Sequence, residues 1–220
     1  MASLSLKNLN KSYDNGFCAV KDFNLEIRDK EFIVLTGPSG SGKSAVLRMI
    51  AGLEEITSGE LWIDGQMVNG IETKNREIAM IFSNYALYEK LTVRENIAFG
   101  LKLRNLSQDE INKRVNETAE ILNLTHLLER KPKALSEAQR YRVALGRAIV
   151  IQPKVLLMDE PLLNLSEKIR EQMCIEIAKL HERLGNTIVY VTKNQTEAME
   201  LATKIVVMNA GDIHKVFINK

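Results

Sequence analysis

The sequence has no apolar run long enough to span a lipid bilayer. Its longest apolar stretches, such as VALGRAIVI, are short and interrupted by charge, whereas a membrane-spanning helix needs about 20 consecutive apolar residues. The N-terminal segment MASLSLKNLNKSY also lacks the apolar centre of a signal peptide. We therefore expect a cytoplasmic protein, and if it works at a membrane, another chain must provide the spanning part.

Cysteine is scarce, and an excess of one charge is missing as well. The two cysteines, Cys18 and Cys174, are far apart and show no metal-ligand spacing. Two reduced thiols are therefore favoured over a disulfide. The formal net charge is only +2, and the lysines and arginines are spread along the chain. This balance gives no reason to expect nucleic acid as a partner.

What the sequence does contain is an alternation of short apolar runs with helical patterns, typical of an α/β fold with a largely parallel sheet. The 220 residues show no internal repeat and no linker, so we predict a single domain over 1–220. A helical insertion is expected over roughly 86–150, and a long helix follows residue 160. The predicted strands lie at 4–9, 23–27, 31–37, 59–65, 77–82, 154–160, 186–192 and 203–211.

The strongest motif lies in the segment EFIVLTGPSGSGKSAVLRMIAGL. Gly37, Gly42, Lys43 and Ser44 match the P-loop pattern, between a predicted strand and a predicted helix. Glycines let backbone N–H groups converge on a polyphosphate, and the helix N-terminus adds partial positive charge. Lys43 is expected to reach the outer phosphates, and the Ser44 hydroxyl to bind Mg²⁺. The alternative is a glycine-rich turn without a ligand.

A pair of acidic residues ends the apolar run LLMDEP. Asp159 is placed to hold Mg²⁺ directly or through water, and Glu160 to polarise a water molecule beside the terminal phosphate. Elsewhere an acidic pair at a strand end is usually a helix cap or a solvated turn. The P-loop favours the catalytic interpretation here.

Several further segments identify a resemblance: ALSEAQRYRVALGRAIV, MDEP, AGLEEITSGELWIDG, NYALY, KPKALS, IAKLHERLG and QTEAM. Nearly end to end, the chain resembles the ATP-binding subunit of an ABC transporter, closest to the ATPases of bacterial carbohydrate importers. The resemblance implies a P-loop NTPase fold with a RecA-like core, an antiparallel β subdomain and an inserted helical subdomain. It also implies transmembrane permease partners and a head-to-tail homodimer that binds two ATP molecules with Mg²⁺.

The resemblance also assigns site residues. Tyr13 takes the place of an aromatic residue that stacks on adenine, and Val20 is expected to line the same pocket. Ser136 and Gln139 belong to the signature segment, which contacts ATP bound by the opposite subunit. The remaining nucleotide-binding residues are expected to be Ser39, Gly40, Ser41, Gly42, Lys43, Ser44 and Ala45.

The sequence departs from the family where the chemistry is expected. Ala45 stands where a threonine is usual, and Ser83 replaces a glutamine that contacts Mg²⁺ and the attacking water. In the signature, Glu137 and Ala138 replace two glycines. A carboxylate at position 137 brings negative charge toward the phosphates of the opposite subunit, and this repulsion argues against a tight dimer.

Two more motifs are altered. Leu163 and Ser166 replace the polar pair of the loop that follows the acidic residues, where only Leu165 is retained. Lys193 and Asn194 stand where the family has histidine and aspartate. The histidine holds the terminal phosphate, and lysine lacks the fixed geometry of the imidazole ring. Such a concentration of changes indicates a degenerate, engineered or redesigned chain.

Two hypotheses follow. In the first, the chain binds Mg-ATP with weak or no hydrolysis. In the second, it is an active ATPase that energises solute import from the cytoplasmic face of the inner membrane, with Glu160 and Lys193 as catalytic residues. An ABC ATPase acting on DNA is disfavoured because no coiled-coil insertion interrupts the core. The chain stops at VFINK, so we expect no C-terminal regulatory domain, and a nucleotide-free monomer is expected.

Overall fold

The computed structural model describes residues 2–104 and 106–219 and divides them into two units. The first unit consists of the chain up to Met80, Lys154–Glu160 and the chain from Glu171 onward. The second unit consists of Ile81–Pro153 and Pro161–Arg170. The second unit therefore arises from two insertions into the first.

A six-stranded sheet is formed by β3 (Phe32–Thr36), β6 (Ile78–Phe82), β7 (Val155–Asp159), β8 (Thr187–Val191), β9 (Lys204–Asn209) and β10 (Asp212–Ile218). Its order is β10-β9-β3-β8-β7-β6, and the pairs from β9 to β7 are parallel. The centre of this sheet consists of short apolar runs that are almost completely buried, as expected for strands covered on both faces. The predicted parallel strands are thus confirmed.

Strand β10 is a correction to the sequence prediction, which places two strands after the long helix where the structure has three. Most of its side chains are exposed, and it pairs antiparallel with β9 at the edge of the sheet. An edge strand of this kind lacks the continuous burial that makes apolar runs recognisable.

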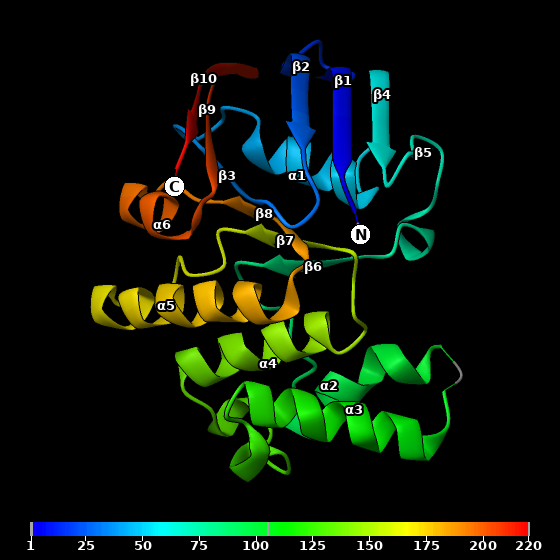
Figure 1. The fold of residues 1–220 in the computed structure, drawn as a ribbon, viewed down its shortest axis with the longest axis vertical. Helices are drawn as coiled ribbons and strands as arrows, with labels where there is room; N and C mark the ends of the chain where they lie inside the picture. The colour runs from blue at the N-terminus through cyan, green and yellow to red at the C-terminus, as the bar shows by residue number, and fades with distance from the viewer. Residues whose placement is uncertain (1, 105, 220) are drawn as a thin grey trace. The chain divides into compact units, whose positions relative to one another are not determined.

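The first unit also contains an antiparallel sheet with the order β2-β1-β4-β5. Its strands are β1 (Leu4–Ser12), β2 (Cys18–Ile27), β4 (Ser58–Ile63) and β5 (Gln66–Met67). Helix α1 (Lys43–Ala51) contacts both this sheet and β7 and β8 of the other sheet (Figure 1). Side chains from both sheets and from α1 therefore share one hydrophobic core.

Two helices follow the acidic pair along the chain, α5 (Glu167–Leu184) and α6 (Gln195–Leu201). A short 3₁₀ helix, η1 (Thr73–Asn75), precedes β6. Apolar residues form a stripe along α5. Its central members Met173, Ile177 and Leu180 are buried, whereas Leu184 at the helix end is 39% exposed. The stripe is therefore a core contact in the middle of the helix and not at its C-terminus.

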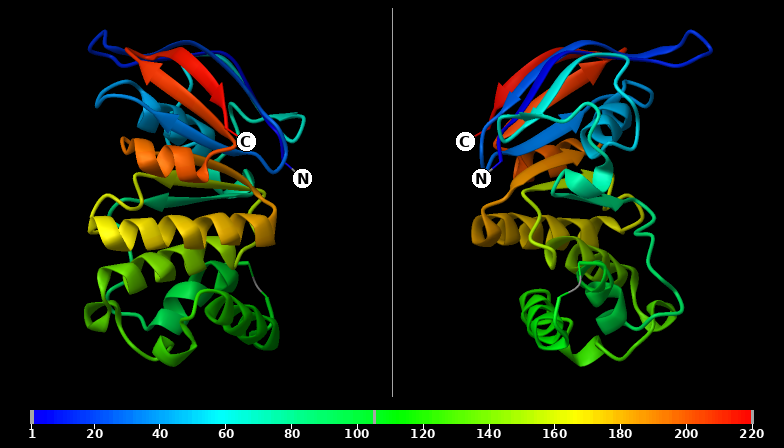
Figure 2. Two further views of the ribbon diagram at one scale, coloured as in Figure 1. Left: turned by 60° about the vertical axis from the view of Figure 1, so that its left-hand side comes forward. Right: turned by 90° about the vertical axis from the view of Figure 1, so that its right-hand side faces the viewer.

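The second unit is helical, with α2 (Val93–Lys102), α3 (Gln108–Ile121), α4 (Glu137–Ile149), η2 (Thr125–Leu127) and η3 (Pro132–Ala134). The three α-helices pack on one another, as the two views of Figure 2 show. Ser107 caps α3 by accepting a hydrogen bond from the Glu110 N–H. One face of α3 is buried through Ile111, Val115 and Thr118.

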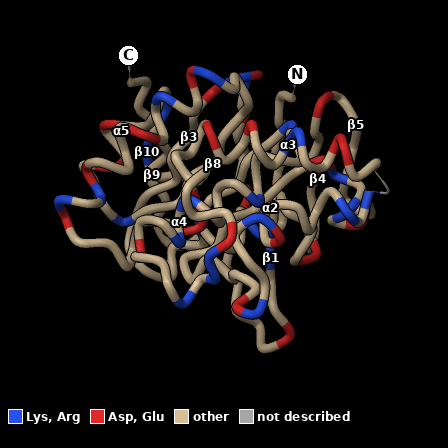
Figure 3. The backbone as a smooth tube through the Cα atoms, turned by 90° about the horizontal axis from the view of Figure 1, so that it is seen from below, with Lys and Arg blue, Asp and Glu red and all other residues tan. Residues whose placement is uncertain are grey.

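Charge is distributed evenly along the chain. Figure 3 shows Lys and Arg interspersed with Asp and Glu over the whole trace, without a long stretch of one sign. Within residues 2–104 and 106–219, no helix combines the length and apolar character that crossing a membrane requires.

Candidate functional site: a P-loop cavity

The P-loop connects β3 to α1, and its glycines adopt conformations that other residues rarely take. Gly37, Gly40 and Gly42 have φ angles of 140°, 78° and 94°. A Cβ atom on Gly37 would lie 2.1 Å from the backbone oxygen of Met208, and one on Gly42 would lie 2.4 Å from the backbone oxygen of Ala19. Only glycine fits at these two positions, because the loop packs closely against the backbone of Met208 and Ala19.

Lys43, the first residue of α1, points back into the loop. Its Nζ donates hydrogen bonds to the backbone oxygens of Gly37 (2.9 Å) and Pro38 (2.7 Å) and to the Ser41 hydroxyl (3.2 Å). Burial lowers the pKa of the Lys43 ammonium, and the Glu160 carboxylate opposes this shift. The ammonium is thus held inside the loop by three oxygen atoms and has a negative group nearby.

Ser44 and Asp159 meet although they lie far apart in sequence. The Ser44 hydroxyl donates a hydrogen bond of 2.9 Å to Asp159 Oδ1. Asp159 ends β7, which runs parallel to β8, and β8 runs parallel to β3, so the carboxyl ends of these strands lie at the same edge of the sheet as the P-loop. Burial raises the pKa of the Asp159 carboxyl, against the hydrogen bond from Ser44. No group of three or more His, Cys, Asp or Glu side chains with metal-site geometry occurs among the described residues.

Glu160 follows in an unusual conformation. Its φ is +46°, and its N–H donates a 3.0 Å hydrogen bond to the backbone oxygen of Val191. Its carboxylate forms an ion pair of 3.2 Å with Lys193 Nζ, and the Glu160 side chain is only 16% exposed. The carboxylate that the sequence predicts to polarise water is thus paired with Lys193.

Asn194, next to Lys193, has a structural role. Its side-chain oxygen accepts hydrogen bonds from the N–H groups of Thr196 (2.8 Å) and Glu197 (3.1 Å), so it caps α6. Asn194 therefore stabilises the N-terminus of α6.

A cavity of about 300 Å³ joins these groups to two aromatic rings. The P-loop, Glu160 and Lys193 line one part of it, and Tyr13 and Phe17 line another. Val20 is completely buried and is absent from the described lining, where its neighbour Ala19 appears instead. The full lining is Tyr13, Phe17, Ala19, Ser39, Gly40, Ser41, Gly42, Lys43, Ser44, Ala45, Arg48, Glu160 and Lys193.

Two polar side chains that the sequence motifs do not indicate hold Tyr13 in place. Its hydroxyl donates a 2.9 Å hydrogen bond to Glu54, which also forms a 3.3 Å ion pair with Arg48. Phe17 was missed as well. Its position four residues after Tyr13, across the turn DNG, is the signal that would have pointed to it.

Ser83 and the loop that follows the acidic pair contact each other within the second unit. The backbone oxygen of Ser83 accepts a 3.0 Å hydrogen bond from the Asn164 side chain. The flanking residues Leu163 and Ser166 are exposed. Ser83 therefore makes this hydrogen bond through its main chain and not through its side chain.

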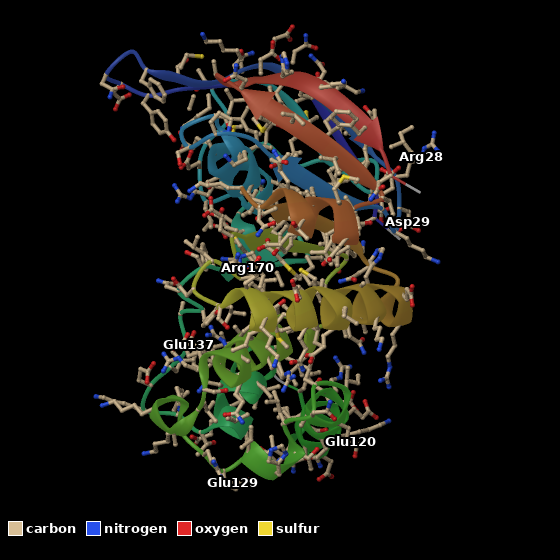
Figure 4. The ribbon with its side chains drawn as sticks, turned by 90° about the vertical axis from the view of Figure 1, so that its left-hand side faces the viewer. Arg28, Asp29, Glu120, Glu129, Glu137 and Arg170 are labelled. Atoms are coloured by element: carbon tan, nitrogen blue, oxygen red, sulfur yellow. The ribbon has the colours of Figure 1, made fainter. Side chains whose placement is uncertain are left out.

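The signature segment forms the N-terminus of α4. The Ser136 hydroxyl accepts from the Gln139 N–H (3.3 Å), and Gln139 Oε1 accepts from the Ser136 N–H (2.9 Å). This reciprocal pair is a capping box. Glu137 occupies the first turn of α4, with a side chain that is 55% exposed (Figure 4). Its carboxylate is 4.0 Å from Arg140, which pairs more closely with Glu89 at 2.7 Å.

Comparison with known proteins places the chain in a family. A family model described as "ABC transporter" matches residues 20–163. The chain belongs to the ABC transporter family. Its α/β P-loop fold, with an antiparallel sheet and a helical part, is confirmed by a dimeric bacterial ABC transporter cassette, MJ0796. That structure has a TM-score of 0.87 and 33% identity, with 99% of both chains covered.

Curated relatives are more similar in sequence. The oligosaccharide import ATP-binding protein MsmX of Bacillus subtilis is 59% identical over 98% of this chain and 59% of its own length. The maltose/maltodextrin import ATP-binding protein MalK of Mannheimia succiniciproducens is 56% identical over 98% of this chain and 58% of its own length. The chain thus spans less than two thirds of the length of these relatives.

Proposed function

We propose that this ABC-family chain binds ATP together with Mg²⁺ in the P-loop cavity. The observation that carries the proposal is that two different groups of residues line one cavity. One group is the glycine-rich loop with its lysine, and the other is a pair of aromatic rings. The first suits a polyphosphate and the second suits a planar base. A nucleoside triphosphate has both parts in one molecule.

The residues near the P-loop fit a magnesium ion. The Ser44 hydroxyl and the Asp159 carboxylate lie 2.9 Å apart, and both offer the oxygen atoms that Mg²⁺ prefers. Burial raises the pKa of the Asp159 carboxyl, although the Ser44 hydrogen bond and the charges of Arg48 and Lys43 oppose this shift. When bound, the ion would neutralise phosphate charge. Ser44 and Asp159 are the residues that would hold it.

Hydrolysis by this chain is proposed to be weak or absent. Glu160 is engaged by Lys193, so its carboxylate is a poorer proton acceptor for water than a free one. Ser83 is too short to reach as a glutamine would, and Glu137 adds a negative charge where the signature meets phosphate. Losing one positioned catalytic group typically lowers a rate by about 10²–10⁴-fold.

The alternative is an active ATPase subunit that energises solute import. It is supported by MsmX and MalK, which are named as import ATP-binding proteins for oligosaccharides and maltose. In that case the chain would act on the cytoplasmic face of a membrane with permease subunits and as a head-to-tail dimer. The exposed carboxylate of Glu137 argues against tight closure of such a dimer.

Calorimetric titration with ATP, with and without Mg²⁺, tests binding, and steady-state phosphate release on the same sample tests turnover. Lys43→Ala is expected to abolish binding, whereas Lys154→Ala, which removes a lysine outside the cavity, should leave it unchanged. Absence of binding by the unaltered chain would overturn the proposal. Phosphate release that saturates with ATP and disappears in Glu160→Gln would establish the alternative.

A further inference from the structure

Phe17 is an aromatic side chain that the hydrophobic core does not use. It is 56% exposed, the highest value among the aromatic side chains of the described residues. Exposing an aromatic ring to water is unfavourable. The ring nevertheless lines the P-loop cavity. Its placement is therefore explained by a ligand better than by packing.

The turn between β1 and β2 fixes Phe17 relative to Tyr13. The Tyr13 N–H donates a 2.9 Å hydrogen bond to the Phe17 backbone oxygen, and the Gly16 N–H donates one of 2.9 Å to the Tyr13 backbone oxygen. The two rings are nearly parallel, with 10° between their planes and 6.3 Å between their centroids. The faces of the two rings therefore have nearly the same orientation, and Lys11 Nζ lies over the Tyr13 ring, 5.1 Å from its centroid.

Neither aromatic side chain has a free polar group that could form a hydrogen bond with the edge of a base. The Tyr13 hydroxyl is used by Glu54, at 2.9 Å, and Glu54 is in turn paired with Arg48. Burial and this hydrogen bond raise the pKa of Tyr13, so the phenol stays protonated and remains a donor to Glu54. Phe17 has no polar atom. Recognition at this end of the cavity must come from ring faces.

We propose that Phe17 is a second base-stacking residue, and that the base of the nucleotide contacts its ring as well as that of Tyr13. The proposal rests on nucleotide binding in the P-loop cavity. Stacking on an aromatic ring tolerates different bases because every base has a π-face. The site is therefore expected to favour the larger purines and to distinguish adenine from guanine poorly.

Dissociation constants for Mg-ATP, Mg-GTP, Mg-UTP and inorganic tripolyphosphate test this role, because tripolyphosphate carries no base. Phe17→Leu is expected to weaken ATP and GTP binding about 5- to 100-fold, in line with the effect of removing one base-stacking ring. Tripolyphosphate binding should stay within about twofold. Phe17→Tyr, which keeps a ring, should restore ATP affinity.

Phe217→Leu is a matched control, since Phe217 is 42% exposed in the same unit and lies outside this cavity. It should leave every constant unchanged. An unchanged ATP affinity in Phe17→Leu would overturn the role of Phe17 alone, and a parallel loss of tripolyphosphate would show that Phe17 only supports the loop. If the unaltered chain binds neither ATP nor tripolyphosphate, the proposed function itself fails.

Discussion

The ion pair between Glu160 and Lys193 gives a direct test of why turnover is expected to be weak. Replacing Lys193 by alanine removes the cation 3.2 Å from the carboxylate. Replacing it by histidine supplies the side chain that the resemblance to ABC ATPases predicts at this position. Both changes free the Glu160 carboxylate to accept a proton from water.

The effect on stability is expected to be small. Two unit charges 3.2 Å apart attract by about 5 kcal/mol at an effective dielectric constant of about 20. The Lys193 side chain is 48% exposed, however. Ion pairs that are open to solvent contribute a net of about 0.2–1 kcal/mol. For a chain of this size, the melting temperature should therefore fall by at most about 4 °C.

The effect on catalysis is expected to be larger. A positioned general base contributes about 10²–10⁴-fold to a rate, so freeing Glu160 should raise phosphate release by about tenfold or more. Lys193→His should exceed Lys193→Ala, since imidazole can also hold the terminal phosphate. The assay is steady-state phosphate release at saturating Mg-ATP, because loss of a cation also weakens ATP affinity.

Two controls show whether the gain comes from Glu160. Adding Glu160→Gln to Lys193→His should abolish it. Lys154→Ala, which removes another partly exposed lysine from ion pairs, should leave release unchanged. The reasoning is refuted if both Lys193 variants release phosphate at the original rate, or if the gain survives Glu160→Gln.

Two further predictions concern the P-loop edge of the sheet. Because burial raises the pKa of Asp159, the charged carboxyl destabilises the fold above that pKa, and this penalty is absent below the unfolded value near 3.8. Asp159→Asn should therefore raise the unfolding free energy at pH 7, as measured by urea denaturation, with a smaller gain near pH 4. Gly37→Ala should destabilise far more than Gly40→Ala, because its Cβ would lie 2.1 Å from a backbone oxygen whereas that of Gly40 meets nothing within 4 Å. Thermal unfolding of both variants checks this, and equal effects would contradict it.

Much of the fold could be predicted because its central strands are short apolar runs with clear ends. Strands β3, β7 and β8 are almost entirely apolar and buried, so their apolar sequences alone indicate that they are buried strands. Strand β10 could not be found in this way. Most of its side chains are exposed, and it is stabilised through pairing with β9, which depends on residues outside the strand.

The site could be predicted as far as it depends on backbone topology. Parallel strands leave their carboxyl ends at one edge, so the meeting of Ser44 and Asp159 follows from the motifs. The partners of long side chains could not be predicted. The pairing of Lys193 with Glu160 depends on side-chain rotamers, and the role of Phe17 depends on a turn that aligns its ring with that of Tyr13.

Several motif residues have structural roles that are independent of catalysis. Ser136 and Gln139 cap α4, Asn194 caps α6, and Lys43 holds the P-loop through three hydrogen bonds. Of these residues only Asn194 is a position at which the sequence is expected to depart from the family, and its side chain still caps α6. Because folding and catalysis depend on different contacts here, the chain can keep its scaffold while its chemistry changes. Introducing the residues that the resemblance predicts at positions 83, 137, 163, 166 and 193 should therefore change turnover far more than stability.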